Sequence, residues 1–471
     1  MRQITLSATD LLKDTRTPFV HFEPGDRGAA ILWVIASHVN VPAGKFAQSH
    51  VFARVPGAKL FLNCAENSWY QNGVGRTLPT LRELITAIGA FTEAFEQTHF
   101  VGHSMGAYLA LILAHEFDRG GQFLATSPEP VLLGPGSRSR DNHVTARFGW
   151  RDLTRRYAGR DPKTPGVTLF GACDPVDAGF LGDADAQSGF YGQVYAAPHH
   201  HGVTEYLTRQ RRYLDLLADP QAGAAQLTED AVIGHPGRYG SAERYRRFNR
   251  VFQRYRAGRL AEAARLINKD PDWGNAGWQA LSASVHRRRG SIAGAVDAAS
   301  RAAAATRDVP LYIREYALAL IAAEDGPKLR KLHRRLLRPD RRHPAIEMTI
   351  RDIERSGLLE RRSANGHSAA SPAPRHHWLN DARSFLAERE RRSKAGTLVP
   401  FAHSVAESFS LASDKPAILN LMTETLVRAG LRRTALARLE QCRASGARGL
   451  HQRTRLVLPD PLERHIDGHF H

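Results

Sequence analysis

Short apolar runs alternate with helix-period stretches through the first 220 residues of the chain. Runs rich in β-branched and aromatic residues predict strands at 19–23, 31–37, 60–64, 99–102, 130–133, 167–171 and 192–196. Apolar residues at helical spacing predict helices at 81–95, 105–117 and 203–217. Several of the predicted strands are continuously apolar, as expected for strands covered on both faces. The alternation predicts an α/β fold with a mostly parallel sheet and flanking helices.

The pattern changes from about residue 225 onward. Strand signals stop, Ala, Leu and Arg dominate, and helical spacing persists almost to the end of the chain. A Gly with an Ala five positions later occurs at Gly258, again 32 residues later at Gly290, and a third time at Gly430. Glycine ends tight turns and alanine lets helices approach closely, so the pattern resembles a tetratricopeptide-type helical repeat, whose usual period is about 34 residues. A generic α-helical bundle is the alternative.

This change of pattern sets the expected domain boundaries. An α/β domain is expected over 1–222, and a helical, tetratricopeptide-like region over 223–360. Residues 361–377 are rich in Ser, Ala, Pro and His, which is typical of a flexible linker. A second helical block is expected over 378–471.

Composition places the chain among globular proteins. Of its 471 residues, 42% are hydrophobic and 24% are charged. No apolar run approaches the roughly 18 residues that a membrane-spanning helix needs, and the first residues lack the basic-then-apolar layout of a signal peptide. The cysteines Cys64, Cys173 and Cys442 are widely spaced, which gives neither a disulfide framework nor a metal site. A cytoplasmic protein without a metal or an organic cofactor is expected.

Positive charge is concentrated in the second part of the chain. The net charge is +18, and residues 1–220 hold 21 basic and 21 acidic side chains, so the whole excess lies beyond them. Such asymmetry predicts either a protein or polyanion partner for the basic helical half, or arginines that form solvated helix faces. Nucleic acid is not favoured as a partner, because the sequence contains no recognised nucleic-acid motif and no zinc-ligand spacing.

The strongest chemical signal is the segment Gly102-His103-Ser104-Met105-Gly106. This G-x-S-x-G pattern follows a predicted strand and opens a predicted helix, which is the context of a nucleophile elbow. The sharp turn leaves room only for small neighbours of the serine, and the two glycines supply that room. The turn also places the hydroxyl at a helix N-terminus, where backbone N–H groups can meet an anion. An ordinary glycine-rich turn is the alternative.

With this motif, residues from about 30 to 215 resemble the α/β-hydrolase superfamily. In that family a nucleophile, an acid and a histidine follow one another along the chain. The predicted strand at 167–171 ends in a G-x-x-D-P sequence that is similar to the family's acid site, and this similarity assigns the acid to Asp174. Asp141, after the preceding predicted strand, and Asp177 are the alternatives.

The resemblance places the catalytic histidine after the last predicted strand, in the run His199-His200-His201. Relatives carry the base just before a glycine or an apolar residue that opens the last helix, which favours His201 because Gly202 follows it. His200 and His199 are the alternatives. Histidine suits the task because it titrates near neutrality and can take the serine proton and return it to a leaving group. A carboxylate fixes its tautomer and stabilises its cation.

The resemblance also assigns an oxyanion hole. The backbone N–H of Met105, directly after the nucleophile, is expected to supply one donor. The second is expected from the loop after the strand at 31–37, and the N–H of His38 is the choice. Many relatives have a glycine after the histidine of this loop, whereas this chain has Val39.

Substrate contacts are expected from a second loop and from two histidines. The segment 62–73 is similar to part of hydrolase-like proteins of bacterial surface-glycan and accessory-secretion systems. Its rings Trp69 and Tyr70 are expected to stack on a sugar or to wall an acyl pocket. A packing cluster that anchors the loop is the alternative. His103 and His200 are further expected substrate contacts.

These assignments predict a serine-dependent acyl-ester hydrolase that works through an acyl-enzyme intermediate. An acyl transferase acting on a glycan or another polymer is one alternative, and a non-catalytic helical-repeat adaptor with a hydrolase-like scaffold is another. The interval from 133 to 167 leaves room for only a small lid, so an open site for a polymer-linked ester is expected. Arg138 and Arg140 in that interval either favour an anionic substrate or are solvated. Residues 1–220 alone are expected to hydrolyse a small ester.

Overall fold

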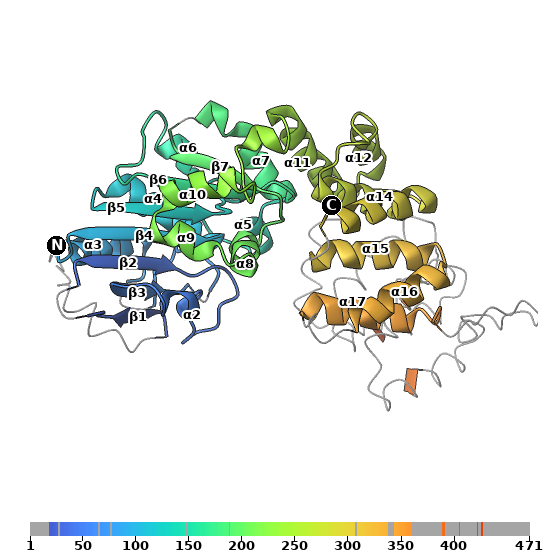
Figure 1. The fold of residues 1–471 in the computed structure, drawn as a ribbon, viewed down its shortest axis with the longest axis horizontal. Helices are drawn as coiled ribbons and strands as arrows, with labels where there is room; N and C mark the ends of the chain where they lie inside the picture. The colour runs from blue at the N-terminus through green and yellow to red at the C-terminus, as the bar shows by residue number, and fades with distance from the viewer. Residues whose placement is uncertain are drawn as a thin grey trace, which may run out of the picture. The chain divides into compact units, whose positions relative to one another are not determined.

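The computed structural model describes residues 18–359 except 27–28, 65, 76–77, 147–148, 188, 307–308 and 338–342, together with 389–390, 405, 422 and 425–426. Contacts divide the chain into two units, Met1–Ser363 and Ala364–His471. The predicted linker at 361–377 lies outside the described residues, as do the motif at Gly430 and nearly all of the predicted block at 378–471. The first unit holds a sheet with its flanking helices, followed by a helical region (Figure 1).

Among the described residues, seven strands form one sheet in the order β1-β3-β2-β4-β5-β6-β7. The strands are β1 (Val20–Glu23), β2 (Ile31–Ala36), β3 (Ala58–Leu62), β4 (Gln97–His103), β5 (Gly120–Thr126), β6 (Gly166–Gly171) and β7 (Gln193–Ala197). Neighbouring strands pair in parallel, except that β1 is antiparallel to β3. The predicted mostly parallel sheet is confirmed, and the carboxyl ends of β2 to β7 share one edge of it.

The prediction is wrong for one strand of this sheet. Residues 130–133 form no sheet strand, since Val131 makes only an isolated bridge, and β5 takes that place in the sheet. The first residues of β5, Gly120 and Gly121, indicate a turn when they are met in the sequence, because glycine weakens strands. In the structure, the absence of a side chain at Gly121 is required by close packing between β5 and β4. A Cβ on Gly121 would lie 2.1 Å from the carbonyl oxygen of Thr98, so only glycine lets β5 approach β4 this closely.

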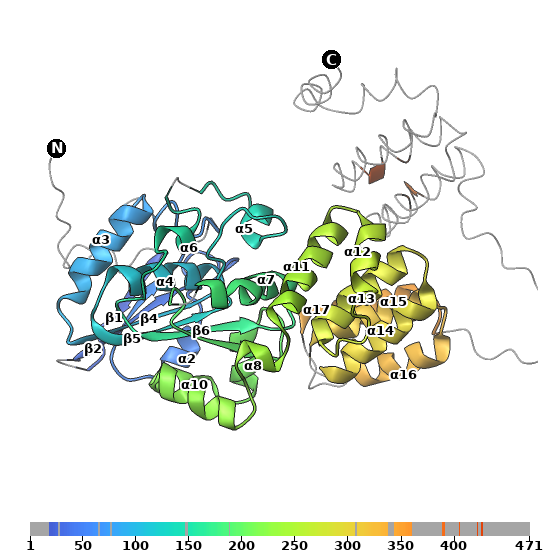
Figure 2. The same cartoon turned by 90° about the horizontal axis from the view of Figure 1, so that it is seen from above.

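Helices cover both faces of the sheet (Figure 2). One face is covered by α3 (Leu81–Thr92), α4 (Met105–Glu116) and α7 (Pro175–Asp183), and the other by α2 (Ser49–Phe52), α8 (Val203–Arg209), α9 (Tyr213–Ala218) and α10 (Pro220–Glu229). In β2, Leu32, Val34 and Ala36 belong to the first core, whereas Trp33 and Ile35 belong to the second. Successive side chains of a strand point to opposite faces, so a strand with two apolar faces is apolar throughout.

The helix predicted at 203–217 is divided into α8 and α9. Arg211 between them has a φ of 59°, a left-handed conformation that interrupts a right-handed helix. Two further short helices, α5 (Arg138–Asp141) and α6 (Leu153–Arg156), lie in the interval between β5 and β6.

The predicted helical region follows α10. Its helices are α11 (Ala242–Arg256), α12 (Leu260–Ile267), α13 (Ala276–Arg288), α14 (Ile292–Ala305), α15 (Pro310–Ala322), α16 (Gly326–Leu336) and α17 (Pro344–Arg355). Gly258 between α11 and α12 has a φ of 74°, and Gly290 between α13 and α14 has a φ of 80°. Both therefore adopt the left-handed conformation that ends a helix. Within the part of the chain that the structure describes, no helix has the length and apolar character that crossing a bilayer requires.

The helical region shares a hydrophobic core with the sheet. Tyr245 and Phe248 of α11, with Trp273 and Trp278, belong to the same buried cluster as α4 and the side chains on one face of β2. Helix α11 packs directly against α7. A chain ending at residue 220 would expose this apolar surface to water, which is unfavourable in proportion to the area exposed. The shared core therefore argues against the expectation that residues 1–220 work alone.

Candidate active site

Chemically reactive side chains meet where the parallel strands end. Strand β4 ends at His103 and leads directly into Ser104, and β7 leads into the loop that carries His201. Strand β6 leads through a short loop into α7, which has Asp174 as its N-cap and Asp177 in its first turn. Parallel strands bring their carboxyl ends to one edge of a sheet, which is where α/β proteins bind ligands. The ring centroids of His103 and His201 are 5.0 Å apart, so the end of β4 lies beside the loop after β7.

Ser104 lies at a strained turn between β4 and α4. Its φ of 56° and ψ of −116° fall in a region that residues with a side chain rarely adopt. Both glycines of the motif are required by close packing, because a Cβ on Gly102 would lie 2.2 Å from the backbone of Gly106, and a Cβ on Gly106 would lie 2.1 Å from the Ala36 carbonyl oxygen. Ser104 as a residue is only 3% exposed.

His201 is held by a buried carboxylate. Its Nδ1 lies 3.0 Å from Oδ1 of Asp177, and Asp177 is fully buried. The other oxygen of Asp177 accepts a hydrogen bond of 3.0 Å from the N–H of Gly171. With its proton on Nδ1, the imidazole donates to Asp177 and keeps a lone pair on Nε2. Among the described residues, nothing forms a hydrogen bond with that buried Nε2.

The structure pairs His201 with Asp177 and not with Asp174, which the sequence favours. Oδ1 of Asp174 accepts from the N–H groups of Val176 and Asp177 at 2.9 and 3.1 Å, so Asp174 is the N-cap of α7. The cap residue is bound to the first turn of its own helix, whereas the carboxylate of Asp177, which lies in that turn, contacts Gly171 at the end of β6 and His201 after β7. Asp141, the other alternative, forms an exposed ion pair with Arg256.

Arg138 bridges the two aspartates of this loop. Its guanidinium donates to Oδ1 of Asp174 at 2.7 Å and to Oδ1 of Asp177 at 3.4 Å. Burial opposes the charge of Arg138, but Asp174 and Asp177 outweigh burial and raise its pKa. Burial alone would raise the pKa of Asp174, yet Arg138 and His201 lower it to about 2. The ligand atoms of Asp174, Asp177 and His201 lie close enough together to hold a metal ion, but Arg138 already supplies positive charge to both carboxylates.

Glu129 fixes the loop that carries Arg138. This carboxylate accepts from the backbone N–H groups of Arg138 at 3.0 Å and of Ser139 at 3.2 Å, and from the Ser139 hydroxyl. Burial raises the pKa of Glu129. No sequence pattern identifies Glu129, and the sequence places Arg138 only near the site. Both residues follow β5. The sequence pattern predicts this strand at 130–133 instead of Gly120–Thr126, so it does not place either residue at the carboxyl edge of the sheet.

The other histidines at this edge are held neutral by burial. The pKa of His103 is well below its usual value because the ring is buried and lies close to His201. Burial lowers the pKa of His199 to about 3 and that of His200 to about 4. Nδ1 of His200 accepts from the N–H of Gly202 at 3.1 Å, and His199 stacks on Tyr206. Neither side chain has a hydrogen bond to an acid among the described residues, which leaves His201 as the base candidate.

Two backbone N–H groups are available near Ser104. Met105 is the first residue of α4, so its N–H has no acceptor within the helix. The N–H of His38 has no acceptor among the described residues, while Nδ1 of this ring lies 2.7 Å from the Val39 carbonyl oxygen. The rings of His38 and His103 are in edge contact, with centroids 5.8 Å apart. The loop after β2 therefore lies beside the end of β4, directly before Ser104.

The aromatic pair expected to contact substrate is part of the core. Trp69 and Tyr70 are both fully buried, so neither ring is available at the surface to stack on a sugar. The Tyr70 hydroxyl lies 3.0 Å from the Ser37 carbonyl oxygen and 3.2 Å from that of Leu62. Through Ser37, Tyr70 anchors the loop that presents His38. These contacts match the alternative given for Trp69 and Tyr70, a packing cluster that anchors their loop.

The helical region forms hydrogen bonds with the loop between β6 and α7. The amide of Asn275, the N-cap of α13, donates to the Ala172 carbonyl oxygen at 2.8 Å. The hydroxyl of Tyr312 on α15 donates to the next carbonyl oxygen, that of Cys173, at 2.8 Å. A Cβ on Gly277 would lie 1.8 Å from the same Cys173 oxygen. Residues about 100 to 140 positions away in the sequence thus hold the loop, and no local pattern predicts this contact.

No family model matches the sequence, and no curated protein shows significant similarity to it.

Proposed function

We propose that this protein is a serine hydrolase of α/β-hydrolase type that cleaves acyl esters, with Ser104 as nucleophile, His201 as base and Asp177 as acid. The strongest support for this proposal comes from the surroundings of the His201 imidazole. Its Nδ1 contacts a fully buried carboxylate, whereas its buried Nε2 has no partner among the described residues. A buried polar atom without a hydrogen bond is destabilising by about 1–3 kcal/mol. Such an atom suits a base whose partner, a serine hydroxyl, forms its bond during the reaction.

In the proposed reaction, Oγ of Ser104 attacks the ester carbonyl carbon while its proton passes to Nε2 of His201. The carbonyl π electrons move to oxygen, and the N–H groups of Met105 and His38 stabilise the resulting oxyanion. Collapse of this intermediate breaks the C–O bond to the alcohol, which receives the proton from the imidazolium and leaves an acyl group on Ser104. Water then loses a proton to His201 and attacks the acyl carbon. Cleavage of the bond from that carbon to Oγ releases the acid, and the imidazolium returns its proton to Oγ of Ser104.

The charges around His201 support this sequence of steps. Asp177 is close enough to stabilise the imidazolium, and its Gly171 hydrogen bond fixes the carboxylate. Arg138 neutralises part of the negative charge of the loop and keeps Asp174 ionised. Cys173 lies in the same loop, but burial raises the pKa of its thiol to about 11, so it stays protonated and is a poor nucleophile near neutral pH.

For the helical region we propose a tetratricopeptide-like arrangement that belongs to the catalytic unit. The left-handed glycines Gly258 and Gly290 at corresponding turns support the repeat. The contacts of Asn275 and Tyr312 with the loop after β6 support a role in positioning Asp177. A partner bound to this region would then act on a surface that also holds the catalytic acid.

Hydrolysis of p-nitrophenyl acetate by the full chain tests the proposed function. The Ser104→Ala variant is expected to show only the background rate, because the nucleophile is lost and the remaining residues act as a unit with it. The matched control is Ser241→Ala, which removes the hydroxyl at the N-cap of α11 and leaves the site intact. Equal activity of the native chain and the Ser104→Ala variant would refute the proposal.

A further inference from the structure

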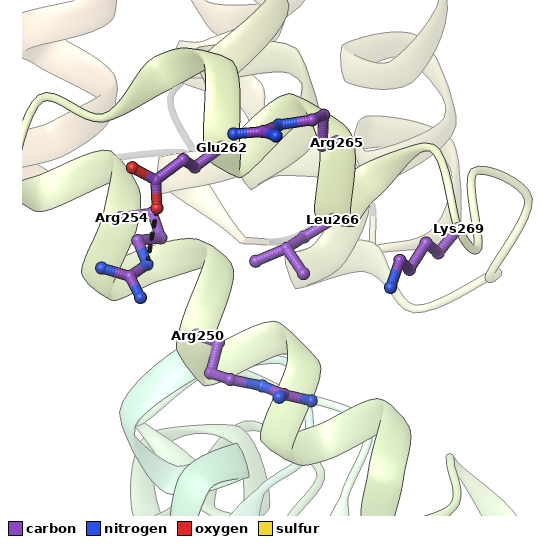
Figure 3. Close-up of a pocket in the computed structure, with 6 residues that line it drawn as sticks. All are labelled: Arg250, Arg254, Glu262, Arg265, Leu266 and Lys269. Atoms are coloured by element: carbon purple, nitrogen blue, oxygen red, sulfur yellow. Dashed lines mark ion pairs between the residues drawn. The ribbon is translucent and has the colours of Figure 1, made fainter.

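A basic groove lies between α11 and α12. It encloses about 340 Å³ and is lined by Arg250, Arg254, Glu262, Arg265, Leu266 and Lys269. Figure 3 shows the two helices as opposite walls, with Leu266 pointing into the space between them. Four cations and one carboxylate give the groove a net charge of +3. Among the described residues, only Arg254 forms an ion pair inside it, at 3.2 Å from Glu262.

Three of the four cations of this groove form no ion pair among the described residues, although Glu243 interacts electrostatically with Arg250 and Lys269. Helix α11 carries six arginines, and five of them form ion pairs: Arg244 with Asp270, Arg246 with Asp183, Arg247 with Glu243, Arg254 with Glu262 and Arg256 with Asp141. Arg250 is the exception among the described residues. Arg265 and Lys269 of the facing wall likewise have no ion pair there. Three unpaired cations therefore line one hollow, where their mutual repulsion favours a bound anion.

Acidic residues limit how large that anion can be. Asp183 and Glu243 line the adjacent hollow together with Arg250, and Asp270 directly follows Lys269 in the chain. An extended polyanion that ran through the groove would pass these carboxylates and be repelled by them. The pattern favours a compact anion that stays between the two helices.

We infer that this groove binds a small molecule that carries a diphosphate group. Two adjacent phosphates match cations that approach from both walls, and the planar guanidinium presents paired donors to phosphate oxygens. The volume of the groove is at the lower end of the range for small-molecule sites. Leu266 offers an apolar contact to the remainder of the molecule. The groove is separate from the residues of the proposed hydrolase, so its test is independent of Ser104.

Titration of the full chain with sodium pyrophosphate by calorimetry at about 150 mM NaCl, a physiological ionic strength, tests the inference. The double variant Arg250→Gln with Lys269→Gln removes one cation from each wall and is expected to weaken binding at least about tenfold, since hydrogen bonds to charged groups are worth about 1.5–3 kcal/mol. The control Arg351→Gln with Arg355→Gln makes the same change in net charge at exposed positions of α17 and is expected to bind like the native chain. Thermal melting confirms that each variant is folded.

A variant that is expected to tighten pyrophosphate binding strengthens the test. Glu262→Gln removes the one carboxylate among the described residues that line the groove and frees Arg254, so it is expected to bind pyrophosphate several-fold more tightly. Absence of saturable binding to the native chain would overturn the inference. Equal weakening in the groove and control variants would do the same, because binding would then follow net charge alone. Preference for a single-stranded oligonucleotide over pyrophosphate, lost in the groove variant, would replace it with a nucleic-acid site.

Discussion

Two aspartates three positions apart have different surroundings at the proposed site. Asp174 caps α7 and pairs with Arg138 at 2.7 Å, whereas Asp177 is fully buried and contacts His201 at 3.0 Å. The chemistry of the two carboxylates is the same, so their roles follow from position alone. We therefore expect Asp177 to orient the base and Asp174 to hold the turn that presents Asp177.

Exchange of each aspartate for asparagine separates these roles. Asp177→Asn is expected to lower kcat for ester hydrolysis on the order of 10³- to 10⁴-fold, because an amide in that place favours the wrong imidazole tautomer. Asp174→Asn keeps a good N-cap residue and is expected to lower kcat less than about tenfold. Steady-state kinetics of both variants gives the comparison. A larger loss in Asp174→Asn would assign the acid to Asp174 after all.

The sequence predicts some of these residues because their signals are local. Ser104 is marked by two glycines between a strand and a helix, and the structure shows that both glycines are needed for close packing. His201 is marked by its place before Gly202. The choice between Asp174 and Asp177 depends on which way one helical turn faces, and Arg138 depends on the path of a loop. Neither the orientation of that helical turn nor the path of that loop can be predicted from a short sequence pattern.

At the scale of elements, the loop after β6 is held from both sides. On one side, Arg138 joins Asp174 and Asp177, and Glu129 fixes the backbone of Arg138. On the other side, α13 and α15 supply hydrogen bonds to successive carbonyl oxygens of the loop. The helical region is therefore part of the scaffold of the site. Its contacts join distant segments, so periodicity identifies the helices without showing what they touch.

Removal of one of these hydrogen bonds tests the role of the helical region. Tyr312→Phe deletes the bond to the Cys173 carbonyl oxygen and is expected to lower kcat several-fold with little change in KM, because the acid loop becomes less well placed. Tyr245→Phe is the matched control, since it deletes a similar bond of 2.9 Å to the Pro236 carbonyl oxygen. Both variants should lose about 1 kcal/mol of stability. An unchanged kcat in Tyr312→Phe would show that the contact is only structural.

At the scale of the whole molecule, several buried histidines make stability depend on pH. Burial lowers the pKa of His99 to about 4, and those of His199 and His200 to about 3 and 4. In the unfolded chain each titrates near 6.5, so below that pH the unfolded chain binds protons that the folded chain excludes. Stability should therefore fall as the pH drops from about 6.5 towards 4. Each such histidine accounts for a loss of about 2 kcal/mol by about pH 5.

His99 allows this dependence to be measured away from the proposed site. The melting temperature of the native chain is expected to fall between about pH 7.5 and pH 5, and the fall should be smaller in His99→Gln because glutamine does not titrate. His99 stacks on Trp33, so the variant loses some stability at every pH, and the slope rather than the absolute value is the readout. Parallel melting curves for the two proteins would contradict the assignment.

The overall architecture is the part that the sequence predicts best. Short, continuously apolar runs and regular helical spacing are repeated signals, and they give the mostly parallel sheet and the helical region. The exception is β5, whose initial glycines serve close packing against β4 although they are typical of a turn. The common core of α11 and the sheet could not be predicted, because apolar residues do not indicate which surface they pack against.

Covalent labelling with a fluorophosphonate tests directly whether His201 activates Ser104. Intact-mass and peptide mapping should find one adduct on Ser104 of the native chain, no adduct in Ser104→Ala, and much slower labelling in His201→Ala. A folded native chain that stays unlabelled under conditions that modify a control hydrolase, or that is modified elsewhere, would contradict the proposed catalytic role of Ser104.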